Sequence, residues 1–286
     1  MTCKHQADLG LHLRLKDTLT NVMQEALAYN VTTIQFFLVR QKDHKYVAIS
    51  AKEKEDFRVL RRSTFSHAFI HSSYWINPAT SQVQTYALSR ELLKKELRMA
   101  QMLEVPSVVL HAGSAKGYVA TDEDPIGKMR AIETLAKMLN SLTRRQRDVM
   151  ILLENTAHGK KTIGSNLDDF VLLRNKLDFP EAIGFCFDTA HAFSYGYRLD
   201  PIDDFVAVLD RCMGLENIKL MHFNDTFDEC GSMLDRHAFP GMGKIGKKTL
   251  QKYLHHPAFK SLPKVIEGPA GNKQIPLSLF QEIAHW

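Results

Sequence analysis

The sequence has few cysteines and no long apolar run. Its 286 residues contain only Cys3, Cys186, Cys212 and Cys230, with no C-x-x-C pair. So few thiols in so long a chain exclude a disulfide-rich scaffold, and we expect free thiols. No window approaches the ~18 continuous apolar residues of a membrane span, and MTCKHQADLG lacks the apolar core of a secretion signal. We therefore expect a cytoplasmic protein with no membrane contact.

The chain also lacks a strong excess of one charge. It has 37 Lys and Arg against 32 Asp and Glu, which gives a net charge of +5. This mild basic bias is compatible with a polyanionic partner but does not require one. Hydrophobic residues at 44% and charged residues at 24% exclude disorder. With no linker or low-complexity segment, residues 1–286 are expected to form one domain, close to the ~250 residues of a β/α barrel.

Six short apolar runs each end on one residue that can bind a metal ion. The runs are HAFIH at His71, VVLH at His111, MILLE at Glu154, GFCFD at Asp188, IKLMH at His222 and KVIE at Glu267. Each has strand length, and most follow a helix-like stretch, which indicates repeated βα units. A single histidine after a strand is more often an ordinary loop residue, so the repetition carries the inference. Strand carboxyl ends converge on one face of a barrel, which predicts a metal site there.

The remaining periodicity completes eight strands and about eight helices. Further strands are predicted near residues 10–13 and 32–38. Helical spacing is found at residues 18–30, 52–62, 81–103, 125–142, 166–176, 201–213, 246–255 and 275–286. The sequence therefore predicts an α/β fold, a single (β/α)8 TIM barrel with its metal site at the C-terminal face of the strands.

Additional metal-type residues lie in loops that follow these strands. The longest non-periodic stretch, residues 223–244, is expected to be a structureless functional loop over the same face, and it carries Asp235 and His237. His191 follows Asp188 within one turn. The nine candidate ligands are His71, His111, Glu154, Asp188, His191, His222, Asp235, His237 and Glu267. Nine exceed the three to five that one ion takes, and imidazole with carboxylate suits zinc or manganese, so we expect two or three ions in one pocket.

Eight other histidines lack the strand-end pattern. They are His5, His12, His44, His67, His158, His255, His256 and His285. We interpret them as structural or solvent-exposed, except that His12 lies on the first strand and could support the ligands from behind.

These motifs resemble the endonuclease IV family of apurinic/apyrimidinic endonucleases over most of the chain. The matching segments are FIHSSYWIN, VVLHAGS, LLENTAHG, CFDTAHAFSYGY, MHFNDT and LDRHAFPGMGKIG, in the family's order. The resemblance implies three zinc ions, with manganese as an alternative at one or more sites. It assigns His71, His111 and Glu154 to one ion, and Glu154 as a bridge to a second held by Asp188, His222 and Glu267. It assigns His191, Asp235 and His237 to the third ion.

The resemblance also implies a reaction. The expected activity is hydrolysis of the phosphodiester 5′ to an abasic site in double-stranded DNA during base excision repair, leaving a 3′-hydroxyl and a 5′-deoxyribose phosphate, with 3′-end trimming as a further activity. Glu154 and Glu267 are the expected catalytic residues, and Glu267 would orient or deprotonate the attacking water. Expected DNA contacts are Arg40, Lys42, Tyr74, Trp75 and Arg236, with Tyr74 and Trp75 as wedges beside the lesion. We expect a monomer, associated with the nucleoid if the source is a bacterium.

The chain departs from the family's usual pattern in two loops. Residues 40–45 read RQKDHK where Asn-Gln-Arg-Gln is usual, and GPAGN follows Glu267 where a Thr is common. Two alternatives stay open at this point. A two-metal sugar isomerase or epimerase on the same barrel has no use for the third ligand group, and a non-catalytic nucleic-acid-binding protein could use the metals structurally.

Overall fold

The strands close into a parallel barrel. The computed structural model describes residues 8–40, 45–119, 124–145, 148–159, 161–269 and 274–286. The barrel strands are β1 (Leu9–Leu13), β2 (Thr33–Phe37), β3 (His67–His71), β4 (Ser107–His111), β5 (Met150–Glu154), β6 (Ile183–Asp188), β7 (Ile218–His222) and β10 (Lys264–Ile266). They are joined in the order β1-β10-β7-β6-β5-β4-β3-β2, and every pairing is parallel. The predicted (β/α)8 barrel is confirmed.

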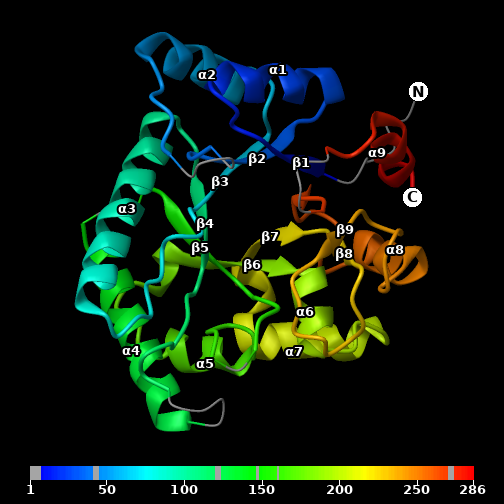
Figure 1. Ribbon diagram of the computed structural model, residues 1–286. Coiled ribbons are helices and arrows are strands. Elements are labelled where there is room, and N and C mark those ends of the chain that lie inside the picture. The colour runs from blue at the N-terminus through cyan, green and yellow to red at the C-terminus, as the bar shows by residue number, and fades with distance from the viewer. Residues whose placement is uncertain (1–7, 41–44, 120–123, 146–147, 160, 270–273) are drawn as a thin grey trace.

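Helices surround the barrel and connect its strands (Figure 1). They are α1 (Leu19–Tyr29), α2 (Ala51–Ser63), α3 (Val83–Met102), α4 (Pro125–Thr143), α5 (Asp168–Arg174), α6 (Thr189–Tyr195), α7 (Ile202–Met213), α8 (Lys247–His255) and α9 (Leu277–Ala284), with short 3-10 turns η1 (Pro180–Ala182) and η2 (Leu215–Asn217). The predicted helices are present with ends shifted by a few residues. The sequence reasoning placed His191 in a loop, and this is wrong, because it lies in α6.

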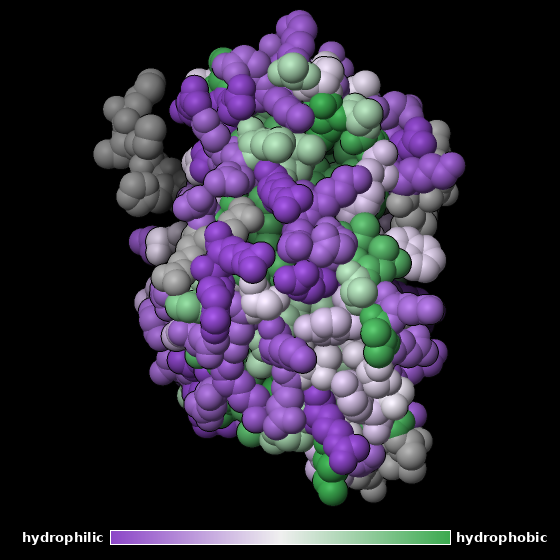
Figure 2. Space-filling view, turned by 90° about the vertical axis from the view of Figure 1, so that its left-hand side faces the viewer, coloured by the Kyte–Doolittle hydropathy of each residue, from purple (hydrophilic) through white to green (hydrophobic). Residues whose placement is uncertain are grey.

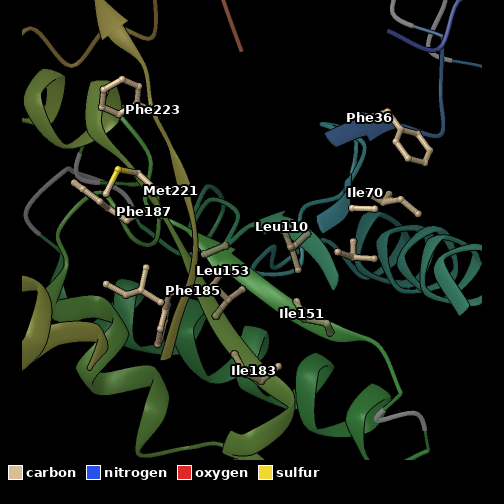
Figure 3. Close-up of a cluster of buried hydrophobic side chains, with 14 of the residues drawn as sticks. Phe36, Ile70, Leu110, Ile151, Leu153, Ile183, Phe185, Phe187, Met221 and Phe223 are labelled. Atoms are coloured by element: carbon tan, nitrogen blue, oxygen red, sulfur yellow. The ribbon is translucent and has the colours of Figure 1, made fainter. Parts of the chain in front are cut away.

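The two-residue period of the strands separates an inner and an outer layer. Outward side chains such as Ile151, Leu153 and Phe187 belong to the large buried cluster that packs the strands against the helices (Figure 3). Inward side chains form a separate small cluster of Phe69, Val109, Leu152, Cys186, Leu220 and Val265. Each of these six stands two residues before one of the six metal-type endings. The six metal-type residues therefore also point into the barrel, one layer closer to the C-terminal ends of the strands than this small cluster.

The stretch at residues 223–244 is more ordered than the sequence suggested. Two-residue strands β8 (Asp225–Thr226) and β9 (His237–Ala238) pair antiparallel. The buried Asp225 accepts hydrogen bonds from the backbone N–H groups of Gly241 (3.1 Å), Gly243 (3.0 Å) and Ile245 (2.9 Å). The expectation of a structureless loop is wrong. Strands this short leave no periodic signal, and the Asp225 carboxylate orders the segment that follows β9.

The outer surface is mostly hydrophilic on the side that carries α3 and α4, with separate apolar patches (Figure 2). Among the described residues, no helix combines the length and the apolar character needed to cross a membrane.

Candidate metal centre

Glu154 lies at the centre of the strand-end cluster and is fully buried. Its Oε2 is 3.2 Å from His71 Nε2 and 3.1 Å from His111 Nε2. Its Oε1 is 2.9 Å from His222 Nδ1 and 3.2 Å from His191 Nδ1. One carboxylate thus faces four imidazoles, which is a suitable position for bridging two cations.

Asp188, His222 and Glu267 form a second group, in which His222 faces the other carboxylate oxygen of Glu154. His222 Nδ1 is 3.3 Å from Glu267 Oε2 and 3.7 Å from Asp188 Oδ2. The other oxygen of Asp188, Oδ1, accepts a hydrogen bond of 2.7 Å from His191 N and so caps α6. The same aspartate therefore starts the helix that carries His191 and presents its second oxygen to the cluster.

The third group joins α6 to the ordered loop. His191 Nε2 and His237 Nε2 are 3.3 Å apart, and each lies close to Asp235 Oδ1, at 3.3 and 3.2 Å. Asp188 Oδ2 is 3.8 Å from His237 Nε2. Two histidine nitrogens facing each other at this distance leave room for a shared cation rather than a strong direct bond.

All nine predicted side chains are therefore brought together. Donor atoms lie within 4.8 Å of one another in three groups: His71, His111 and Glu154; Asp188, His191 and His237; and Glu154, Asp188, His222 and Glu267. Asp235 contacts both histidines of the group at α6, as the distances above show. The division of these residues among particular ions stays a prediction.

The charge of the cluster fits bound cations. Four carboxylates, those of Glu154, Asp188, Asp235 and Glu267, have histidines as their ionic partners, and no lysine or arginine among the described residues pairs with them. Burial favours the neutral form of Glu154, but His222 and His111 outweigh it and hold the pKa of this carboxyl well below its usual range. Burial also favours the neutral form of His191, which by itself would lower its pKa. The carboxylates of Asp188 and Asp235 outweigh this effect and raise that pKa well above its usual value. The cluster thus attracts positive charge, and with this donor set it fits divalent metal ions.

Two asparagines that the sequence reasoning missed support the ligands. Asn224 donates from Nδ2 to Asp188 Oδ2 (2.7 Å) and Glu267 Oε2 (3.1 Å). Asn155 accepts from Asp188 N at 2.7 Å, and its carbonyl accepts from His191 Nδ1 at 2.8 Å. Their positions one or two residues after a strand-end ligand were the available signal.

Two of the histidines set aside earlier lie next to the cluster. His12 Nδ1 is 3.3 Å from Glu267 Oε1, and His158 Nε2 is 4.0 Å from Asp235 Oδ2. His12 therefore has the supporting position expected for it. His158 is exposed, in agreement with its interpretation as a solvent-exposed residue, and it lies beside Asp235. His5 and His44 lie outside the described residues.

Tyr74 lies at the mouth of the site, and Trp75 follows it in the chain. Tyr74 packs its ring against those of His71 and His111, with centroids 5.6 and 5.4 Å apart. Yet Tyr74 is 61% exposed and Trp75 is 64% exposed. Large aromatic groups held beside a polar cluster but open to solvent can stack on a bound ligand.

The predicted basic contacts have partners of their own. Arg236 donates twice from Nε to the buried Asp228, at 3.0 Å to each oxygen, and Arg40 Nη1 is 3.3 Å from Asp17. Lys42 lies outside the described residues. Arg236 thus anchors the ordered loop through its hydrogen bonds to Asp228.

The buried Glu96 of α3 joins the segments that follow β2 and β3. Its Oε1 accepts hydrogen bonds from Tyr46 Oη (2.8 Å) and Ser73 N (3.2 Å). Burial raises its pKa from 4.5 to about 7, against the lowering effect of these two hydrogen bonds. Ser73 directly precedes Tyr74, so Glu96 also fixes the start of the aromatic mouth.

Glu96→Gln should alter how stability depends on pH. An acid whose pKa is higher in the folded state stabilises the fold below its unfolded pKa and loses that contribution as pH rises through the folded value. Between pH 4.5 and 7 the unfolding free energy of the native protein should fall, relative to the variant, by on the order of 3 kcal/mol. Denaturant unfolding of both proteins at several pH values tests this, and parallel curves would contradict it.

Comparison with known proteins gives a consistent family. Residues 23–286 match the family model described as "Xylose isomerase-like TIM barrel". A protein of Heliobacterium modesticaldum named "Probable endonuclease 4" is 33% identical over 265 residues, which cover 91% of this chain and 92% of the relative. The chain belongs to the endonuclease IV family of xylose isomerase-like TIM barrels. The resemblance inferred from the six strand endings and their neighbouring segments is confirmed.

Solved structures agree with the endonuclease IV assignment. Endonuclease IV from Thermus thermophilus superposes with a TM-score of 0.78 at 28% identity and covers 97% of this chain and 98% of its own. A D-tagatose 3-epimerase-like protein has a TM-score of 0.68 at 20% identity, covering 96% of both chains. The epimerase-like neighbour shares the fold alone at that identity.

Proposed function

We propose that this protein is a metal-dependent endonuclease of base excision repair that hydrolyses the phosphodiester 5′ to an abasic site in double-stranded DNA. The products would be a 3′-hydroxyl and a 5′-deoxyribose phosphate, with trimming of blocked 3′ ends as a further activity. The observation that carries the proposal is the gathering of nine histidine and carboxylate side chains in a chain of the endonuclease IV family. We further propose that it acts as a monomer.

Three zinc ions would occupy the cluster, with manganese as an alternative at one or more positions. His71, His111 and Glu154 would hold one ion, Glu154, Asp188, His222 and Glu267 a second, and His191, Asp235 and His237 the third. Such ions lower the pKa of water to near 7 and neutralise phosphate oxygens.

The two catalytic glutamates differ in their surroundings. Glu154 is fully buried between four histidines and would be a ligand to two cations. The Glu267 side chain is 12% exposed and is held from two sides, by Asn224 Nδ2 at 3.1 Å and Gln35 Nε2 at 3.0 Å. A fixed carboxylate that keeps some access to solvent can orient a water and accept its proton. We assign that role to Glu267.

Lesion selectivity would come from the aromatic mouth. An abasic nucleotide has already lost its base stacking, so moving it out of the helix costs less than moving an intact nucleotide. Tyr74 is fixed against the histidine rings and Trp75 stands beside it, exposed. The two rings would fill the space beside the lesion while Arg40, Lys42 and Arg236 contact phosphates.

Trp75→Ala should weaken binding to duplexes with an abasic site more than binding to intact duplexes. Stacking of an aromatic ring on a base contributes about 1–3 kcal/mol, so we expect a loss of about 5- to 150-fold in affinity. Fluorescence anisotropy with the two duplexes measures the difference. Leu88→Ala on the outer face of α3 is a control, since that exposed side chain lies outside the site. An equal loss of affinity for both duplexes would contradict a wedge role.

A sugar isomerase or epimerase is the second candidate, because structural neighbours with this fold include an epimerase-like protein. Two metal groups would suffice for that chemistry, and the third group, which joins α6 to the ordered loop, favours the endonuclease. The test is to incubate one preparation with an abasic duplex and with aldose and ketose sugars. Incision without sugar interconversion supports the proposal, and sugar turnover without incision would replace it.

A further inference from the structure

Gln35 is a polar residue inside the barrel whose contacts extend beyond the hydrogen bond to Glu267 described above. It lies on β2 in register with Phe69 of the inner apolar cluster, and parallel register partners share a face. Its side chain is completely buried. Nε2 is 2.8 Å from His12 Nδ1 and 3.0 Å from Glu267 Oε1, while Oε1 is 2.9 Å from His222 Nε2. One amide therefore contacts two residues of the candidate metal centre.

The carboxylate of Glu267 fixes which way this amide points. A carboxylate oxygen only accepts hydrogen bonds, so the amide NH₂ of Gln35 must face Glu267. The same Nε2 lies 2.8 Å from His12 Nδ1, so the second amide hydrogen points to that ring nitrogen. The amide oxygen then faces His222, and an oxygen can only accept. His222 Nε2 must therefore carry a hydrogen.

A hydrogen on Nε2 leaves Nδ1 of His222 as the nitrogen for a metal ion. Nδ1 is the atom that faces Glu154 at 2.9 Å and Glu267 at 3.3 Å. Two other histidines of the cluster have a ring hydrogen bond of this kind with main-chain partners. His71 Nδ1 bonds the carbonyl of Ser72 at 2.9 Å, and His191 Nδ1 bonds that of Asn155 at 2.8 Å, which leaves Nε2 as the ligand atom in each.

We propose that Gln35 is the positioning residue that selects Nδ1 of His222 for metal binding and holds Glu267 beside it. Ligand histidines commonly donate their second ring N–H to a protein oxygen, which fixes the ring and its protonation. Here a side chain provides that oxygen, so it can be removed by mutation without altering the main chain. The inference rests on the metal centre of the proposed function but does not depend on the substrate.

Gln35→Met should weaken metal binding while keeping the volume of the side chain. Loss of a hydrogen-bonding partner behind a ligand typically costs 10- to 100-fold in metal affinity. We expect a loss of that size for at least one zinc ion, measured by competition with a chromophoric chelator in the absence of DNA. Thr33→Val is the matched control: Thr33 lies two residues earlier on the same face of β2, and its buried hydroxyl lacks a hydrogen-bond partner among the described residues. It should bind zinc as the native protein does.

The native protein provides a second test that needs no variant. In zinc-loaded protein labelled with ¹⁵N-histidine, long-range proton–nitrogen correlations should show the His222 hydrogen on Nε2 and none on Nδ1. Three results would each overturn the inference. They are a His222 hydrogen on Nδ1, native zinc affinity in the Gln35→Met variant, and a native protein that binds no divalent ion. If zinc affinity falls as expected but the native protein does not cut abasic DNA, the inference holds and the proposed function fails.

Discussion

Glu154→Ala should reduce incision of an abasic duplex by at least about 10³-fold while the protein still binds the duplex. The carboxylate contacts His71 and His111 through one oxygen and His191 and His222 through the other. Its loss therefore removes a side chain shared by the first two ligand groups. Bound metals stabilise the charge of a transition state by several kcal/mol, and each 1.36 kcal/mol corresponds to a factor of ten in rate. Single-turnover incision and duplex binding should be measured on the same preparation.

Two variants separate loss of chemistry from loss of structure. Glu154→Gln keeps the shape of the buried side chain but removes its charge, and it should be nearly as inactive as the alanine variant. Glu55→Gln changes an exposed glutamate on α2, far from the cluster, and should be fully active. Full incision by Glu154→Ala would rule out a bridging role for this residue.

Prolonged chelation should abolish incision and lower the thermal midpoint, and zinc should restore both. Without cations, the carboxylates of Glu154, Asp188, Asp235 and Glu267 lie in one cluster in which, among the described residues, histidines supply the positive charge. An ion at about 1,000 times its dissociation constant adds about 4 kcal/mol to stability, or roughly 10 °C in the midpoint for a chain of this size.

Elemental analysis must accompany each chelated sample, because a tightly held ion survives brief treatment. Magnesium added to the chelated protein is a control, since imidazole-rich sites bind it poorly compared with zinc. Undiminished incision by a sample shown to be free of metal would reject metal catalysis altogether.

The strand-end ligands could be predicted because one local rule applies to all of them. In a parallel barrel the last residue of each strand faces the same end, and the two-residue period decides whether it points inward. His111 and Glu154, for example, repeat the inward direction of Val109 and Leu152. His191, Asp235 and His237 carry no such strand signal. They were predicted from their positions in the segments that follow two of these strands, and the family resemblance then assigned them to a third ion.

The supporting residues could not be predicted in the same way. Gln35 is one polar residue within an apolar strand, and its importance depends on the closure of the barrel, which brings β2, β7 and β10 around one point. Asn224 is similar, since its two acceptors come from strands distant in sequence. α6 was missed because its start depends on the Asp188 side chain, and β8 and β9 because two residues show no period. Pairings between distant segments are visible only once the chain is folded.

The central claim is that a metal cluster in this barrel cuts DNA at abasic sites. The most direct measurement combines a metal count with incision of a labelled duplex that carries one abasic site, followed by analysis of the new ends. The account predicts about three bound ions, cleavage on the 5′ side of the lesion, and ends that are a 3′-hydroxyl and a 5′-deoxyribose phosphate. An intact duplex after incubation with fully metallated protein would contradict it.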